Sequence, residues 1–265
     1  MDSDTMTLPG LTKEQIMAVD RIMVENLDVP VELMMEHAGS TLARLAVQCR
    51  HDETTTFRII VGSGNNGAGG MVAARRLFAW GYNVEVYAPR GVISFRRIPA
   101  GQYVRLRSLS VPVSNGMPSE MSSTDVVLDA YLGYGFVSRD DEITDNVFEY
   151  LAQSDCTVCL DVPSGLNPDT GDSQADLKPT STLTIAFVKE GLLKAYPDFT
   201  GDLYICDIGV PMEVYQSQIG LGWEEPFTKD SLSQLVKAFQ VNSMASVEIV
   251  ERDGIIGWLP SFVSK

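Results

Sequence analysis

The sequence predicts an α/β protein: a three-layer α/β/α Rossmann-like sandwich built on a mostly parallel central sheet. Short apolar runs alternate with segments of helical periodicity from about residue 57 onward, as expected for parallel strands joined by helices. Most of these runs are apolar throughout rather than at every second position. We therefore expect helices to cover both faces of the sheet.

Two helices are expected before the sheet. Thr12 and Gln15 have the spacing of a capping box, and apolar residues at helical spacing follow to about Asn26. Pro30 is expected to open the second helix. The predicted buried positions are Ile16, Val19, Ile22 and Met23 in the first helix, and Leu33, Met34, Leu42, Leu45 and Ala46 in the second.

Five apolar runs predict strands, at 57–62, 83–88, 125–130, 156–162 and 182–187. The segment GSGNNGAGG at 62–70 is predicted to be a loop, because glycine is unfavourable inside helices. Helices are expected at 71–80, where Gly81 ends the helix, and at 143–153.

The domain prediction has three parts. Residues 1–10 form a flexible arm, residues 11–215 form the main domain, and residues 216–265 form an extension packed on the same domain. Within the tail we expect short helices at 211–220 and 229–240, and a hairpin at 247–260 around Asp253-Gly254. The tail is expected to form either an extra layer or a dimer contact.

Composition limits the classes of partner. The chain has 20 Lys and Arg against 35 Asp and Glu, a formal net charge of −15. Such a chain repels nucleic acid and anionic membranes, so a phosphorylated ligand needs backbone N–H groups and a few placed cations. No apolar run is long enough to cross a bilayer, and no leader is expected before Leu11. We expect a cytoplasmic protein.

The cysteines do not predict a metal or redox site. Cys156 and Cys159 form a CxxC motif inside the apolar run CTVCLDV, where thiols pack as small hydrophobic groups. His37 and His51 are not spaced to complete a zinc site.

Three polar clusters follow predicted strands, at 62–70, 129–135 and 161–165. Ligands bind beyond the carboxyl ends of the strands in an open parallel sheet. Glycines there allow close approach of backbone to ligand, and Asn, Asp and Ser oxygens suit a hard monovalent cation. Each cluster also has a purely structural interpretation, as a tight turn or as a helix N-cap.

The first cluster also fits G-x-G-x-x-G at Gly62, Gly64 and Gly67, a fingerprint of dinucleotide-binding oxidoreductases. The acidic residue expected at the end of the next strand is missing, because that strand runs into Pro89-Arg90. A dinucleotide-dependent oxidoreductase is therefore the weaker alternative.

Taken together, the motifs resemble the YjeF N-terminal domain family, whose enzymes are NAD(P)H-hydrate epimerases. The resemblance extends from about Leu11 to Pro211. It is carried by MMEHAG at 34–39, GSGNNGAGG at 62–70, DAYLGYG at 129–135, DVPSG at 161–165, TLTIAFVKEG at 182–191 and DIGVP at 207–211.

The resemblance implies an isomerase that interconverts the R and S forms of hydrated NADH or NADPH at C6. It also implies a homodimer and a bound potassium ion. Asp161 is the expected catalytic acid/base, and potassium is expected on Asn66, Asp129 and Ser164. The expected substrate-binding residues are Asn65, Asn66, Gly67, Ala68, Gly69, Gly133, Tyr134, Gly135, Phe136, Val137, Ser138, Arg139, Asp161 and Lys189, with Lys189 offsetting phosphate charge.

The chain departs from the family pattern at two positions. The family's NNGGDG is NNGAGG here, so Ala68 replaces a glycine and Gly69 replaces the aspartate. The loop therefore lacks one carboxylate, and three hypotheses follow. Asp161 carries the chemistry alone, the site has been adapted to another isomerisation or water-addition reaction, or the protein is a non-catalytic binding or scaffold protein. At a cleft rim, restoring both residues is expected to cost little stability.

Overall fold

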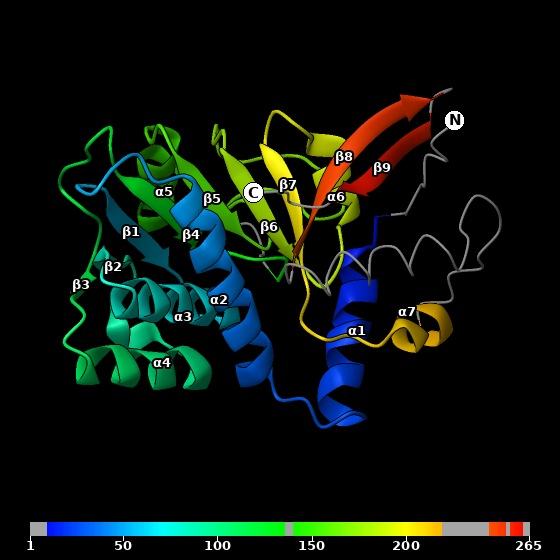
Figure 1. Cartoon of the computed structure of the whole chain (residues 1–265), viewed down its shortest axis with the longest axis horizontal. Helices are drawn as coiled ribbons and strands as arrows, with labels where there is room; N and C mark the ends of the chain where they lie inside the picture. The colour runs from blue at the N-terminus through cyan, green and yellow to red at the C-terminus, as the bar shows by residue number, and fades with distance from the viewer. Residues whose placement is uncertain (1–9, 136–139, 219–243, 253–254, 262–265) are drawn as a thin grey trace.

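The computed structural model describes residues 10–135, 140–218, 244–252 and 255–261. These residues form one sheet of nine strands in the order β3-β2-β1-β4-β5-β6-β7-β8-β9 (Figure 1). The strands from β3 to β7 in this order pair in parallel, whereas β8 and β9 pair antiparallel. The strands are β1 Thr56–Val61, β2 Asn83–Ala88, β3 Val113–Asn115, β4 Val126–Ala130, β5 Thr157–Leu160, β6 Ser181–Ile185, β7 Asp202–Cys206, β8 Met244–Arg252 and β9 Ile255–Ser261.

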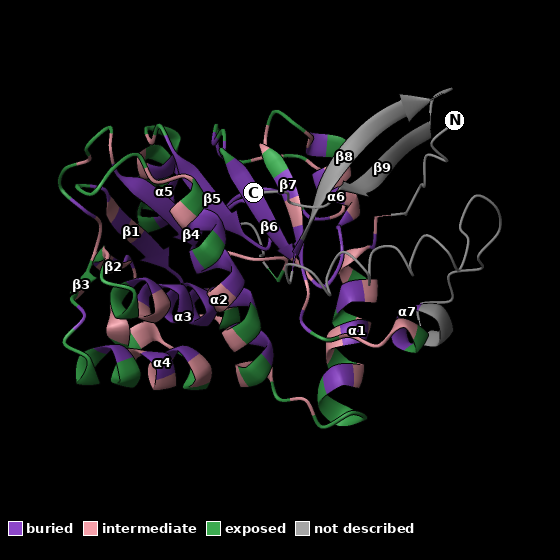
Figure 2. Ribbon diagram, viewed as in Figure 1, coloured by how far each residue is buried: buried purple, intermediate pink, exposed green. Residues whose placement is uncertain are grey.

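Helices cover both faces of the sheet, which confirms the predicted α/β sandwich. They are α1 Lys13–Glu25, α2 Val31–Gln48, α3 Asn65–Ala79, α4 Arg97–Ser108, α5 Glu142–Ala152, α6 Glu190–Ala195 and α7 Met212–Gln218. Ile59 of β1 belongs to the apolar cluster that includes α1, α2 and α3. Its neighbour Ile60 belongs to a second cluster with Val147 and Leu151 of α5. The parallel strands between these layers are largely buried (Figure 2).

The strand order creates a switch point beside β1. The chain leaves β1 to build β2 and β3 on one side, then returns to place β4 on the other. Ile60 of β1 is paired in register with Tyr87 of β2 on one side and with Asp129 of β4 on the other. Loops leaving β1 and β4 diverge at such a point, which opens a crevice where open α/β sheets bind ligands.

The two predicted N-terminal helices are confirmed. Thr12 caps α1, and both hydrogen bonds of the capping box with Gln15 are present. Pro30 is the N-cap of α2. One predicted core position is wrong, because Leu33 is 55% exposed. It lies in the first turn of α2.

The prediction of a loop over 62–70 is wrong beyond Gly64, because α3 begins at Asn65. The glycines in this helix allow close packing rather than a turn. A Cβ added to Gly67 would lie 2.0 Å from the Gly62 carbonyl oxygen, and one on Gly70 would lie 2.5 Å from the Ala130 Cβ. Tertiary packing therefore outweighs the low helix propensity of the sequence.

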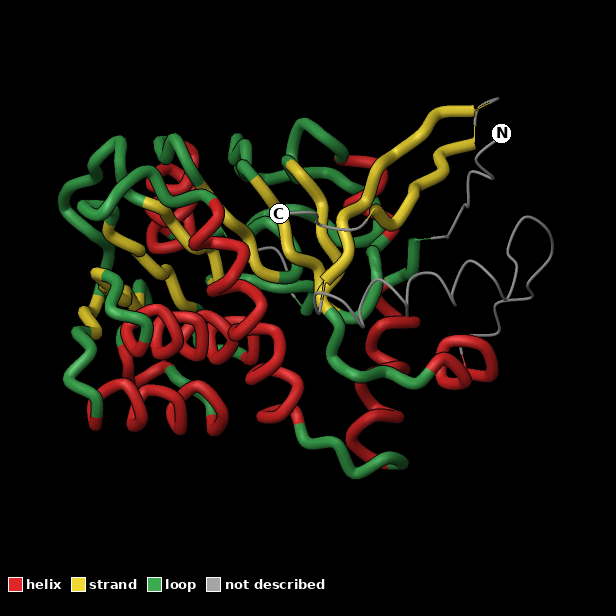
Figure 3. Tube along the Cα trace, viewed as in Figure 1, coloured by secondary structure: helices red, strands yellow, loops and turns green. Residues whose placement is uncertain are grey.

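Several elements were not predicted, among them α4, α6, β3 and β7. The predicted C-terminal hairpin is confirmed as β8 and β9. β8 pairs with the edge strand β7, so the hairpin extends the sheet instead of adding a layer (Figure 3). The helix expected at 229–240 lies outside the described residues, and the division into three parts remains a prediction.

Candidate active site

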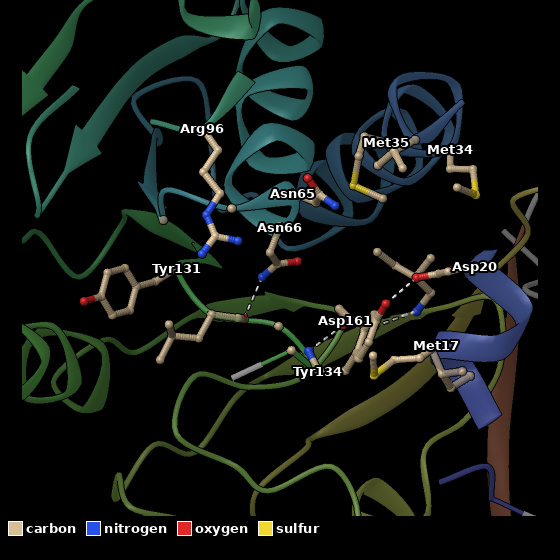
Figure 4. A pocket seen from close by; sticks show the side chains of 18 of the residues that line it. Met17, Asp20, Met34, Met35, Asn65, Asn66, Arg96, Tyr131, Tyr134 and Asp161 are labelled. Carbon is tan, nitrogen blue, oxygen red and sulfur yellow. Dashed lines mark hydrogen bonds between the residues drawn. The ribbon is translucent and has the colours of Figure 1, made fainter. Parts of the chain in front are cut away.

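A cavity of about 560 Å³ lies at the carboxyl ends of β1, β4 and β5. Its apolar wall comes from α1 and α2, and its polar wall comes from the loops after these strands (Figure 4). The apolar wall includes Ile16, Met17, Val31, Met34 and Met35, and the polar wall includes Ser63, Asn65, Asn66, Tyr134, Asp161 and Lys189. The three polar clusters predicted from the sequence therefore meet at one end of the sheet.

Asp161 directly follows β5 and is held in a strained conformation. It is 3% exposed and has a φ of 71°. A non-glycine residue in the left-handed region costs energy and is common at functional sites. Its backbone N–H donates to the Leu183 carbonyl oxygen at 2.7 Å, which fixes the turn. The turn leaves the Asp161 carboxylate in the cavity wall.

Lys189 forms a buried ion pair with Asp161. The Lys189 Nζ is 2.6 Å from the Asp161 Oδ1, and it also donates to Thr184 Oγ1 at 2.9 Å and to the Ile185 carbonyl oxygen at 2.8 Å. These contacts use all three ammonium donors of a side chain that is 0% exposed. Lys189 lines the cavity, but Asp161 already neutralises its charge, so a role of Lys189 in offsetting phosphate charge stays a prediction.

The loop after β4 contributes a backbone donor to the same carboxylate. The Tyr134 N–H donates to Asp161 Oδ2 at 2.9 Å. At Gly133 an added Cβ would lie 3.1 Å from this oxygen and 3.2 Å from Asn66 Cγ, so the loop approaches the site closely. Gly135 also lines the cavity, whereas the predicted substrate residues at 136–139 lie outside the described part of the chain.

The start of α3 divides the predicted substrate residues into two groups. Asn65 and Asn66 line the cavity. Gly67, Ala68 and Gly69 are buried and lie behind that lining. Within the described residues no side chain caps this helix, and because Gly64, Asn65 and Asn66 line the cavity, its first N–H groups and the positive end of its dipole lie at the cavity.

Apolar side chains occupy the space beside Gly69, the position where the family pattern has an aspartate. A Cβ added at Gly69 would lie 2.7 Å from Leu160 Cδ2 and 3.7 Å from Met35 Sδ. An aspartate there would displace the Leu160 side chain. The prediction that restoring Gly and Asp at Ala68 and Gly69 costs little stability is therefore wrong, since neither position lies at a rim.

The residues expected to bind potassium lie together. Asp129 is 0% exposed, and its carboxylate accepts from the Ser164 N–H and Oγ, both at 2.7 Å, and from the Tyr131 N–H at 3.2 Å. Ser164 Oγ accepts from the Leu132 N–H, and the Leu132 carbonyl oxygen accepts from Asn66 Nδ2 at 2.6 Å. The Asn66 Oδ1 is buried without a hydrogen-bond partner.

This arrangement suits a cation. Burial raises the pKa of Asp129, and hydrogen bonds from neutral groups of Ser164, Tyr131 and Cys159 only partly offset that effect. The orphaned Asn66 amide oxygen and the buried Asp129 carboxylate, which are linked through the Leu132 backbone, are ligands of the kind that potassium takes, and a positive charge between them would offset both penalties. In the described residues, no group of three or more His, Cys, Asp or Glu side chains could hold a metal ion.

Sequence reasoning missed four charged residues of the cavity, namely Lys13, Asp20, Arg90 and Arg96. Arg96 lines it beside the start of α3, and within the described part of the chain it forms no salt bridge. Asp20 of α1 lies on the opposite side. A signal for Asp20 existed, because it lies between Ile16 and Met23 on the buried face of α1, where a lone carboxylate is unusual.

The family model for YjeF-related protein N-termini matches residues 31–191. The chain belongs to this family. An NAD(P)H-hydrate epimerase from Dehalogenimonas lykanthroporepellens is 30% identical over 243 residues, which cover 90% of this chain and 97% of that protein. A bifunctional NAD(P)H-hydrate repair enzyme from Archaeoglobus fulgidus is 34% identical over 194 residues, 72% of this chain but 39% of the longer relative.

A solved structure supports the fold of this YjeF-related chain. Yeast ynu0 superimposes with a TM-score of 0.73 at 21% identity, and the match covers 90% of this chain and all of the yeast chain. In the described residues no helix is long and apolar enough to span a membrane. All four cysteines are free, and Cys156 and Cys159 are buried, so neither is bridged and both pack as the sequence predicted.

Proposed function

We propose that this protein is an NAD(P)H-hydrate epimerase that inverts C6 of the hydrated nicotinamide ring. The observation that carries the proposal is the Asp161–Lys189 ion pair in the wall of a cavity at the switch point of the sheet. Relatives that bear this name cover nearly the whole chain. The pair holds an ionised acid/base in a buried place, which inversion through loss and return of water requires.

The reaction needs no redox partner. The ring enamine pushes out the C6 hydroxyl, which takes a proton and leaves as water, so that a C6–N1 double bond forms. Water then attacks C6 from the other face and gives up a proton, and the electron pair returns to N1. The Asp161 carboxylate is the proposed proton acceptor for the attacking water.

We further propose that the substrate's phosphates lie against the start of α3. Free N–H groups at a helix N-terminus bind anions, and no acidic residue lies in this first turn. Arg96 adds a cation on the same side of the cavity. The wall of α1 and α2 would then face the nicotinamide ring, because most of the residues that these helices contribute to the cavity are apolar.

Potassium is part of the proposal. Asn66, Asp129 and Ser164 would hold the ion, which would supply a fixed positive charge beside the Leu132 loop and so keep Gly133 and Tyr134 in place. By family likeness we also propose a homodimer in the cytoplasm, and light scattering of the purified chain tests the oligomeric state.

The proposal is tested by incubating the purified chain with one epimer of hydrated NADH and following the other by chromatography. We expect inversion, faster in potassium chloride than in equal sodium chloride. We also expect a ligand at 100 times its Kd to stabilise the fold by about 2.7 kcal/mol. Stabilisation without inversion indicates an adapted or binding site. If the chain shows neither stabilisation nor inversion, the protein is a scaffold.

A further inference from the structure

A second carboxylate faces the cavity from α1. Asp20 lines the cavity together with Ile16 and Met17 of the same helix. Its neighbours on the inner face of α1 are apolar and buried, so the carboxyl group is partly removed from water. A carboxylate in such a place costs desolvation energy that pure packing would avoid. Its location therefore needs a reason other than the stability of α1.

Tyr134 connects Asp20 to Asp161. The Tyr134 hydroxyl donates to Asp20 Oδ2, while the backbone N–H of the same residue donates to Asp161 Oδ2 at 2.9 Å. In Figure 4, Asp20 reaches in from α1 and meets the Tyr134 side chain in front of Asp161. One residue of the β4 loop thus positions two carboxylates that come from different elements and line the same cavity.

The two carboxylates have different electrostatic surroundings. Asp161 pairs with the ammonium of Lys189 at 2.6 Å, whereas Asp20 forms no salt bridge within the described residues. Burial raises the pKa of Asp20; the Tyr134 hydroxyl and the more distant Lys189 charge oppose this, and the Asp161 charge adds to it. Two carboxyl groups in such different environments suit opposite roles, one as an acid and one as a base.

We infer that Asp20 is a second catalytic residue, which exchanges a proton with the C6 oxygen on one face of the ring while Asp161 serves the other face. This inference rests on the proposed epimerase function. It also supplies the carboxylate that Gly69 does not provide, from α1 instead of α3.

The proposed step balances as follows. In its protonated form, the Asp20 carboxyl group gives its proton to the C6 hydroxyl, the C6–O bond breaks, and water leaves as N1 donates its electron pair to C6. Asp161 takes a proton from water that attacks the opposite face, a new C6–O bond forms, and the pair returns to N1. The two groups exchange roles in the reverse direction, and solvent re-equilibrates their protons.

The test uses Asp20→Asn, with Glu25→Gln as the matched control, because Glu25 is an exposed carboxylate near the end of the same helix. Both variants and the wild type receive each epimer of hydrated NADH in oxygen-18 water with potassium. Chromatography measures inversion, and mass spectrometry measures label at C6. Thermal shift with the substrate measures binding.

We expect the wild type and Glu25→Gln to incorporate one solvent oxygen per inversion. Asp20→Asn should lose about 10²–10⁴-fold in inversion while still binding the substrate. One epimer should nevertheless exchange its C6 oxygen without inversion, because Asp161 in its protonated form can still give its proton to the C6 hydroxyl on its own face and take a proton back from the returning water. A purely structural role of Asp20 would slow exchange and inversion together for both epimers.

Inversion by Asp20→Asn near the wild-type rate overturns the inference, and so does an equal loss of exchange for both epimers. If Asp20→Asn does not fold, Tyr134→Phe replaces it, since this variant keeps the N–H bond to Asp161 and loses the hydroxyl at Asp20. It should lower inversion by up to about tenfold, and an unchanged rate overturns the inference. A wild type without inversion overturns the proposed function itself, and this inference with it.

Discussion

The carboxyl ends of β4 and β5 each carry an aspartate, Asp129 as the next-to-last residue of β4 and Asp161 directly after β5, with opposite results. Asp129 and Asp161 are both buried and lie in adjacent parallel strand ends. Asp129 accepts hydrogen bonds only from neutral groups and does not line the cavity, whereas Asp161 pairs with Lys189 and does. The end of a strand therefore brings a carboxylate to the site, but its neighbours decide its chemistry.

The largest expected effect is a difference in kcat between variants of these two aspartates. Asp161→Asn should lower kcat by about 10²–10⁴-fold, because the proposed proton acceptor is lost. Asp129→Asn places an amide nitrogen against an N–H or O–H donor, so it should lose roughly 1–3 kcal/mol of stability. Its kcat at saturating potassium should fall far less. Steady-state kinetics and urea unfolding of both variants check this, and equal losses of kcat would contradict it.

The second prediction concerns the stability of the ion pair at the β5 end. Lys189→Met leaves the Asp161 carboxylate buried without a counter-charge, which should cost about 3–5 kcal/mol. Combining Lys189→Met with Asp161→Asn should recover much of that loss without recovering turnover. Urea unfolding of the two single variants and the double variant measures the coupling. Additive losses would show that the pair is not coupled.

A third carboxylate placed beside the β5 end should disturb packing. Gly69→Asp should lower stability by roughly 1–3 kcal/mol, because its side chain must displace Leu160. Pairing it with Leu160→Ala should restore part of the loss by making room. Thermal unfolding of the single and double variants measures this. A stable Gly69→Asp variant with raised epimerase activity would indicate a decayed site instead.

The smallest effect is a pH dependence at Asp20, which like Asp129 forms no salt bridge within the described residues. Its pKa is raised above 3.8, so the folded state keeps a proton that the unfolded chain releases. The contribution of Asp20 to stability therefore falls as pH rises from about 3.9 through its raised pKa. Urea midpoints from pH 4 to 8 should show Asp20→Asn gaining stability relative to the wild type. A loss of stability in Asp20→Asn relative to the wild type over this pH range would mean that the fold stabilises the Asp20 carboxylate as an anion.

Much of the site could be predicted because the ends of parallel strands can be recognised in the sequence. Apolar runs followed by Asp129 and Asp161 indicate parallel strands, and all such ends lie at one edge of the sheet. The conformation of the Gly-rich segment was harder to predict, because its glycines are needed for close packing between helices. Gly39, for example, lies against the Gly69 carbonyl oxygen. Those contacts join α2 to α3, and local propensity carries no information about them.

The sequence by itself determined the layer order, the cap at Thr12 and the meeting of three polar clusters, since hydrogen bonding and apolar periodicity act over a few residues. The tertiary structure alone decided that Lys189 neutralises Asp161, that Leu160 fills the space beside Gly69 and that α1 brings Asp20 to Tyr134. Each of these contacts joins distant segments. Charge, volume and desolvation at such contacts depend on which groups the fold brings together.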